Sequence, residues 1–188
     1  MRSLPPSPII DRSEWGITVG ERAWDLLWTP HRIAYIRGES RPADTEAGPQ
    51  CPFCRTDDSE ESLIVARGEH AYVVMNLFPY NPGHVLICPY RHVADFTDLT
   101  GAETAELSWF QARMMRAIRA ASNPAGFNIG LNQGPAAGAG ISGHLHQHIV
   151  PRWPGDSNFM TTVGGSRTMV MLLEESRDLF AAALGELD

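Results

Sequence analysis

The chain has 188 residues and a formal net charge of −7, with 43% hydrophobic and 20% charged residues. This length suits one domain with its own core, and the composition is typical of an ordinary globular protein. The negative charge argues against a broad electrostatic grip on nucleic acid. No apolar run approaches the roughly 20 residues that span a bilayer. We therefore expect neither a nucleic-acid nor a membrane partner, although a local pocket field can still bind a small anion.

The first residues, MRSLPPSPIIDRSEW, contain three prolines and no continuous apolar stretch, so they do not resemble a signal peptide. Three cysteines, Cys51, Cys54 and Cys88, suit a reducing compartment better than a disulfide framework. We therefore expect a cytoplasmic protein. Residues 1–50 are expected to form an N-terminal arm and a surface connection, and residues 51–188 to form the domain.

Residues 62–90 contain three short β-rich runs, LIVAR, AYVVMN and HVLICP, separated by the turn formers RGE and FPYNPG. Runs of this kind between turn residues predict strands, and their close succession predicts an antiparallel meander. Cys88 lies within the third run, and we expect it to belong to the core.

Residues 101–121 change to a helical period, with apolar residues three and four positions apart. The stripe consists of Leu107, Phe110, Met114, Ala117 or Ile118, and Ala121. Thr100 with Glu103 supplies a capping box, and Asn123-Pro124 supplies the stop. Residues 127–132 predict another strand, and residues 169–184 predict a final helix. Strands and helices in this order favour an α+β fold.

The stretch GHLHQHIVPRW, residues 143–153, places His144, His146 and His148 at every second position. Side chains alternate along a β-strand, so three imidazoles would share one face. Imidazole can bind a metal, transfer a proton or attack an electrophile. Two histidines at this spacing can also hold a catalytic zinc. The residues alone leave these roles open, together with a merely exposed strand.

The glycine-rich segment GPAAGAGISG, residues 134–143, leads into the histidines. It lacks the lysine of a Walker loop, and GISGH at residues 140–144 breaks the G-x-S-x-G serine motif at its last position. Its backbone N–H groups can still form an anion-binding concavity. The alternative is a flexible turn without a ligand.

Residues 144–150 resemble the signature of the histidine triad (HIT) family, His-x-His-x-His followed by two apolar residues, with Gln147 as a mild departure. Residues 73–99 are similar to the strand–turn–strand of that family, and LNQGPAAGAG resembles its approach to the triad. The resemblance covers about residues 50–155. It implies an antiparallel sheet with a long helix packed on it and a C-terminal helix. PRWPGDSNF is most similar to the bacterial branch that cleaves dinucleoside polyphosphates, especially actinobacterial-type diadenosine tetraphosphate phosphorylases.

This resemblance implies a nucleotidyl-transfer enzyme in which His146 attacks the α-phosphorus of a nucleotide. We expect its other ring nitrogen to be held by a backbone carbonyl, and His148 to donate to phosphoryl or departing oxygens. We expect inorganic phosphate to resolve the nucleotidyl-histidine, giving ATP and ADP from diadenosine tetraphosphate. Arg152 and the Ser157-Asn158 pair are the expected donors to this incoming phosphate.

Further residues are assigned to the substrate by resemblance. Asn76 is expected at the ribose, and His84 and Leu86 at the base; the alternatives are a turn-stabilising Asn, a turn His and a core Leu. Apart from the resemblance, the need to keep water from the incoming phosphate suggests Trp153 as a wall, although Arg152 and Trp153 could instead only pack the end of the strand. Phosphate contacts are expected from Asn132, Gly138, Gly140, Ser142 and His148.

The Cys51-Pro-Phe-Cys54 pair indicates either a zinc site or two buried thiols. Resemblance to nucleotidyl transferases and bacterial HIT proteins implies that His92 and His144 complete a closed Cys₂His₂ zinc site. The family also implies a homodimer or higher oligomer, and the wide spread of Trp109, Phe110 and Met115 around the expected helix agrees with a second covered face.

Other functions remain open on the sequence. The protein could hydrolyse the same substrates or nucleoside phosphoramidates. It could bind nucleotides as a regulatory HIT protein with little turnover, or act as a zinc hydrolase whose metal is held by the triad itself.

Overall fold

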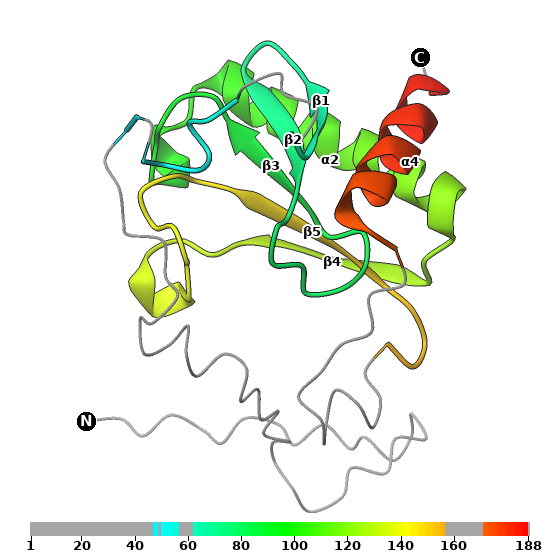
Figure 1. The fold of residues 1–188 in the computed structure, drawn as a ribbon. Helices are drawn as coiled ribbons and strands as arrows, with labels where there is room; N and C mark the ends of the chain where they lie inside the picture. Colours follow the sequence, from blue (N-terminus) through cyan, green and yellow to red (C-terminus); the bar gives the residue numbers. More distant parts are fainter. Residues whose placement is uncertain (1–46, 49, 57–61, 157–170, 188) are drawn as a thin grey trace, which may run out of the picture.

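The computed structural model describes residues 47–48, 50–56, 62–156 and 171–187, so almost all of the expected N-terminal arm lies outside the described residues. Within these ranges an antiparallel sheet carries two helices (Figure 1). The elements are β1 Ile64–Arg67, β2 Ala71–Met75, β3 Val85–Pro89, the 3₁₀ turn η2 Phe96–Asp98, α2 Gly101–Ser122, β4 Gly126–Leu131, the 3₁₀ turn η3 Pro135–Ala137, β5 Gln147–Arg152 and α4 Leu173–Gly185. The α+β class agrees with the prediction.

The described part of the chain forms a five-stranded sheet in the order β1-β2-β3-β5-β4, with every neighbouring pair antiparallel. The first three strands are the predicted meander. β5 lies between β3 and β4, where Leu86 is opposite His148 and Ile87 is opposite Gln147. Because side chains alternate along a strand, Leu86 and His148 share one face and Ile87 and Gln147 share the other. β5 is thus hydrogen-bonded to a neighbouring strand along both of its edges.

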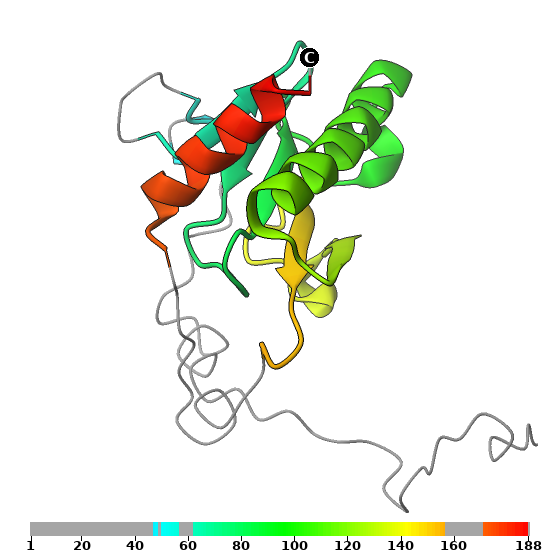
Figure 2. The same ribbon diagram turned by 90° about the vertical axis from the view of Figure 1, so that its right-hand side faces the viewer.

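Helices α2 and α4 run side by side against one face of the sheet (Figure 2). The buried residues of α2 include the predicted stripe, and α4 adds a second apolar set. These residues are Leu107, Phe110, Met114, Ala117 and Ile118 from α2, and Phe180, Ala183 and Leu184 from α4. Each large aliphatic or aromatic side chain buried there contributes about 1.5–3 kcal/mol. The main core therefore lies on the helix side and leaves the opposite face for other groups.

The capping box of α2 is present as predicted. The Thr100 side chain accepts from the backbone N–H of Glu103, and the Glu103 carboxylate accepts from the backbone N–H of Thr100 at 2.7 Å. Asn123 then adopts a left-handed conformation with φ 46° and ends the helix. In the described ranges, no helix combines the length and the apolar character needed to cross a bilayer.

Two boundaries differ from the sequence prediction. β5 begins at Gln147, so only His148 of the triad lies within the strand. The reason is that the carbonyl of His144 is bonded by an imidazole, while the N–H of Leu145 donates at 2.7 Å to Val93 in the loop after β3. Helix α4 begins at Leu173, later than predicted, with the N–H of its capping residue bonded to Glu175.

Candidate active site

Four potential metal ligands meet on the face of the sheet opposite the helices: Cys51, Cys54, His92 and His144. Their ligand atoms all lie within 4.8 Å of one another. Cys51 Sγ is 3.4 Å from His144 Nδ1, and Cys54 Sγ is 3.3 Å from His92 Nδ1. Tetrahedral zinc, with Zn–S near 2.3 Å and Zn–N near 2.0–2.1 Å, would set sulfur and nitrogen about 3.6 Å apart. The cluster therefore fits the Cys₂His₂ site expected from the sequence and could bind a metal.

His144 is oriented for this cluster by its second nitrogen. Its Nε2 is 2.9 Å from the carbonyl oxygen of Pro89, and a carbonyl can only accept, so Nε2 carries the hydrogen. Nδ1 then keeps its lone pair toward the two sulfur atoms, the usual arrangement for a ligating histidine. Burial lowers the pKa of His144 to about 4. The ring is therefore neutral near pH 7, as ligation requires.

His146 is fixed in the tautomer that a nucleophile needs. Its Nδ1 donates to the carbonyl oxygen of His144 at 2.8 Å, so Nε2 keeps its lone pair. The side chain is buried, and burial lowers its pKa below the ordinary value. A neutral imidazole with a free lone pair can attack an electrophile. The zinc hydrolase alternative fits less well, because the metal cluster of the described residues takes only His144 from the triad.

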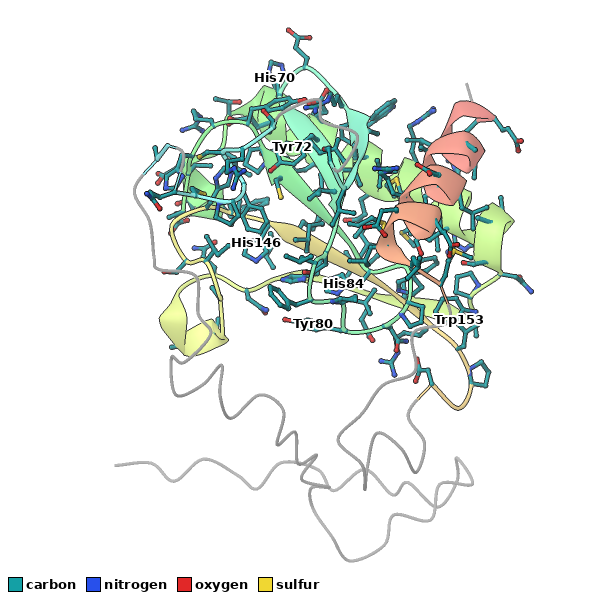
Figure 3. All side chains as sticks on the ribbon, in the orientation of Figure 1. His70, Tyr72, Tyr80, His84, His146 and Trp153 are labelled. Carbon is teal, nitrogen blue, oxygen red and sulfur yellow. The ribbon has the colours of Figure 1, made fainter. Side chains whose placement is uncertain are left out.

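His148 is bonded by His84, which is in turn bonded by the backbone of Tyr80; Figure 3 shows Tyr80 and His84 next to each other. The backbone N–H of Tyr80 donates to His84 Nδ1 at 3.0 Å, so the hydrogen of the His84 ring is on Nε2. This Nε2–H donates to His148 Nδ1 at 2.9 Å, which leaves the hydrogen of His148 on its own Nε2. Among the described residues, His148 Nε2 has no hydrogen-bond partner although it is buried. It is an N–H donor available to a ligand.

The rings of His146 and His148 lie next to each other, with centroids 5.1 Å apart. Burial, with a smaller effect from His146, lowers the pKa of His148 to about 4. Tyr80 stacks over the His148 ring at 5.6 Å and 14° between the planes. The site thus pairs a neutral imidazole that has a free lone pair with a neutral N–H donor, a combination suited to an electrophile that carries anionic oxygens.

A family model described as the HIT domain matches residues 58–155, just over half of the chain. The chain belongs to the HIT family. A Mycobacterium tuberculosis protein named AP-4-A phosphorylase is 46% identical over 185 residues, which cover 96% of this chain and 92% of that protein. The Arabidopsis thaliana protein named bifunctional bis(5'-adenosyl)-triphosphatase/adenylylsulfatase FHIT is 40% identical over 87 residues, 46% of this chain and 47% of that protein.

A solved structure adds a comparison of the fold. A zinc-bound histidine triad family protein from Mycobacterium smegmatis superimposes with a TM-score of 0.61 at 32% identity, covering 73% of this chain and 95% of that chain. The likeness agrees with the HIT fold expected from the sequence. It also means that a protein of the same family and fold holds zinc.

The residues expected around ribose and base lie near His148 but differ in accessibility. Asn76 Nδ2 is 3.3 Å from His84 Nδ1, and Asn76 Oδ1 accepts from the N–H of Phe78. Leu86 is buried beside His148. His84 is fully buried, with an exposed fraction of 0%, so its ring has no surface for a base. The expected base contact of His84 does not fit this burial, and we interpret His84 as a positioning residue for His148.

The phosphate-binding candidates lie in the segment between β4 and β5. Asn132, Gly138, Gly140 and Ser142 are all partly exposed. Gly138 has φ +82°, a left-handed conformation that favours glycine, and nothing lies within 4 Å of the position of an added Cβ. These residues leave open backbone directly before the triad, and their contacts with phosphate remain a prediction.

Arg152 and Trp153 do not take the places expected for them. Arg152 makes a two-pronged ion pair with Asp156, at 2.6 Å and 2.9 Å, and its Nη1 donates to Asn128. Trp153 Nε1 donates to the carbonyl of Ser122 at 3.3 Å. Trp153 is seven residues beyond His146, about 24 Å along an extended chain, and Figure 3 shows the two far apart. Within one subunit neither side chain reaches the triad, and Ser157 and Asn158 lie outside the described residues.

Gln147 also has a structural explanation. Its Nε2 donates to Gln111 Oε1 of helix α2 at 2.6 Å. Because Gln147 and His148 are consecutive in β5, they point to opposite faces of the sheet. The polar departure from the family pattern therefore contacts the helix layer and not the site.

Two site residues were missed by the sequence analysis. Phe53 packs against His146, with ring centroids 4.8 Å apart, and Tyr80 packs against His84 and His148. The available signals were the position of Phe53 between two cysteines and that of Tyr80 in the turn before His84. Neither signal specifies a contact, because both depend on the tertiary fold.

Proposed function

We propose that the protein is a nucleotidyl-transfer enzyme that cleaves diadenosine tetraphosphate by phosphorolysis, with ATP and ADP as products. The observation that carries this proposal is the pairing of a neutral His146, whose Nε2 lone pair is free, with the Nε2–H donor of His148. The choice of substrate is supported by the M. tuberculosis relative, which matches 96% of this chain and is named AP-4-A phosphorylase.

In the first step His146 Nε2 attacks an α-phosphorus of the substrate. The P–N bond forms, the P–O bond to the adjacent phosphate breaks, and ATP leaves with the bonding electron pair on its terminal oxygen. His148 Nε2–H donates a hydrogen bond to this oxygen as its charge develops. The adenylylated ring gains positive charge, and its Nδ1–H remains on the carbonyl of His144, which stabilises that charge.

In the second step an oxygen of inorganic phosphate attacks the same phosphorus. The P–N bond breaks, its electron pair returns to His146 Nε2, and ADP is released. The open backbone around Gly138 and Gly140, with Asn132 and Ser142, would bind the phosphate oxygens through N–H and side-chain donors.

Zinc is the proposed metal of the Cys51, Cys54, His92 and His144 cluster. When bound, it would supply a structural crosslink, since four protein ligands leave no open position for water or substrate. The zinc-bound family member from M. smegmatis, 32% identical, supports this choice.

Hydrolysis of the same substrate is the second candidate. It shares the first step, and water then releases AMP in place of ADP. The specific observation in its favour is the engagement of Arg152 by Asp156 and Asn128, because this side chain was the expected donor to an incoming phosphate.

The test is turnover of diadenosine tetraphosphate with and without inorganic phosphate, with the nucleotides separated by chromatography. We expect phosphate-dependent formation of ATP and ADP, and a labelled adenylyl-enzyme when phosphate is withheld. His146→Ala should abolish both, whereas His70→Ala, which removes a histidine on the β1–β2 turn away from the triad (Figure 3), should retain them. ATP and AMP at equal rates in both conditions would identify a hydrolase. Tight nucleotide binding without turnover would identify a regulatory protein.

The proposal includes a cytoplasmic homodimer. β4 is an edge strand, and Trp109 on α2 is 51% exposed although its neighbour Phe110 is buried; an open edge and an exposed aromatic ring are features that a second copy could cover. The free thiols of the metal cluster suit a reducing compartment. A sedimentation mass near 20.7 kDa would contradict the dimer.

A further inference from the structure

We propose that Phe53 is a positioning residue for His146, and that the metal-ligand turn, residues 51–54, acts through it to fix the plane of the attacking ring. The inference rests on the proposed function, because it assigns His146 the role of nucleophile. It concerns a residue that neither binds the metal nor takes part in proton or phosphoryl transfer.

The first support is the arrangement of rings around His146. Its Nδ1 bond to the carbonyl of His144 fixes one atom of the imidazole, but one hydrogen bond still allows the ring plane to tilt. The Phe53 ring contacts it with centroids 4.8 Å apart and 41° between planes. The His148 ring contacts it at 5.1 Å and 63°. Two neighbouring rings therefore restrict the tilt that the hydrogen bond leaves free.

The second support is the way in which Phe53 itself is held. It lies between Cys51 and Cys54, whose sulfur atoms contact His144 and His92 in the metal cluster. Its carbonyl oxygen accepts from the hydroxyl of Tyr72 at 2.7 Å, and Tyr72 is buried in β2. The phenyl ring also meets the His144 ring edge-on at 5.7 Å. The residues on both sides of Phe53 are thus held by the metal cluster, and its own carbonyl is held by Tyr72 of β2.

The chemical consequence concerns orientation. Attack on phosphorus requires the Nε2 lone pair to point at an atom about 3–3.5 Å away, and misplacement by about 1 Å can cost about 100-fold in rate. A tilted imidazole would keep its tautomer, and the other contacts with the substrate would be unchanged. The loss should therefore appear in kcat and not in KM. If Phe53 instead contacted the nucleotide, its removal would weaken binding and raise KM.

The experiment compares Phe53→Ala with Phe53→Tyr, which keeps the aromatic ring, and with the control Phe127→Ala, which removes a partly buried phenyl group on β4. For each variant kcat, KM for diadenosine tetraphosphate and zinc per chain are measured. Phe53→Ala should lower kcat by about 10- to 100-fold, with KM within about twofold and zinc content unchanged. Phe53→Tyr should recover most of kcat, and the control should behave as wild type.

A second readout requires no turnover. In ¹⁵N NMR spectra of the resting protein, the His146 ring signals should broaden or split in Phe53→Ala and return to a single sharp set in Phe53→Tyr. A raised KM with unchanged kcat would identify Phe53 as a wall of the nucleotide pocket and overturn the inference. A loss of kcat that only follows loss of zinc would overturn it as well. If wild type does not turn over the substrate, the proposed function fails, and unchanged ring signals in Phe53→Ala would separately refute the positioning role.

Discussion

Replacing His84 with leucine tests whether the hydrogen of His148 is directed onto Nε2 from behind. His84→Leu keeps an apolar side chain of similar size in a fully buried position but removes both ring nitrogens. The backbone N–H of Tyr80 loses its acceptor, and His148 Nδ1 loses its donor. The hydrogen of His148 is then free to move to Nδ1.

Two magnitudes follow from these contacts. A buried polar group left without a partner costs about 1–3 kcal/mol of stability, so the free energy of unfolding should fall by about that amount. Removal of one donor to a developing oxyanion typically costs about 100- to 1,000-fold in kcat. This is an upper bound here, because His148 still populates the productive tautomer for part of the time. We therefore expect a loss of about 10- to 100-fold in kcat.

The assay is steady-state cleavage of diadenosine tetraphosphate together with urea unfolding of each variant. His84→Gln is the matched control, since its side-chain amide can still donate toward His148 Nδ1, and it should retain more of kcat than His84→Leu. A leucine variant that is destabilised but keeps wild-type kcat would refute the reasoning. His84 would then contribute packing alone.

Two further predictions concern the metal and the first turn of α2. Chelation, or Cys54→Ser, should lower the free energy of unfolding by several kcal/mol, because structural zinc binding contributes directly to folding. Metal analysis of gently purified wild type should give about one zinc per chain. A content below about a tenth of a zinc per chain would contradict the site. Hydrogen bonding from Arg91 lowers the pKa of Glu103 from 4.5 to about 2. The stabilisation by the Glu103 carboxylate is therefore present above pH 4.5 and lost as the pH falls toward 2. Glu103→Gln should lower the free energy of unfolding by about 1–3 kcal/mol near pH 7 and by progressively less as the pH falls. A difference between variant and wild type that stays constant with pH would exclude this linkage.

Helix α2 could be predicted because its determinants are local. The apolar stripe, the Thr100–Glu103 capping box and the stop at Asn123 are all set by residues within one or a few turns of each other. The strands of the meander are equally local, since each pairs with the next across a short turn. For these elements the residues that form the sequence pattern are also the residues that make the contacts.

The histidines could be recognised from the sequence, but their surroundings could not. His144 donates to the carbonyl of Pro89, which is 55 positions away in the sequence. His148 accepts from His84, which is 64 positions away. Which nitrogen of each ring carries the hydrogen depends on those distant partners. The burial that keeps the rings neutral also exists only in the folded chain, so their chemical roles could be expected only by resemblance.

Arg152 and Trp153 show the limit of a local pattern, because within one subunit their side chains bond to Asp156 and Ser122 and not to the triad. Both residues follow the triad closely in sequence, yet β5 is extended and carries them to its far end. There Asp156, four residues further along, neutralises Arg152 and has its own pKa lowered by that contact. Nearness in sequence is a poor guide to nearness in a strand, where each residue adds about 3.4 Å.

The two faces of the sheet carry different amounts of apolar packing. The helix face carries the large apolar core, including Ile87 and Ile149 of the central strands. The other face has a small apolar cluster, Tyr72, Leu86 and Cys88, and above it the metal ligands and the triad. Because the helix face carries most of the burial, substitutions at Phe53 or His84 should alter ring orientation more than global folding. The proposed role of the metal-ligand turn is to fix the ring of His146 on this face, where the apolar cluster is small.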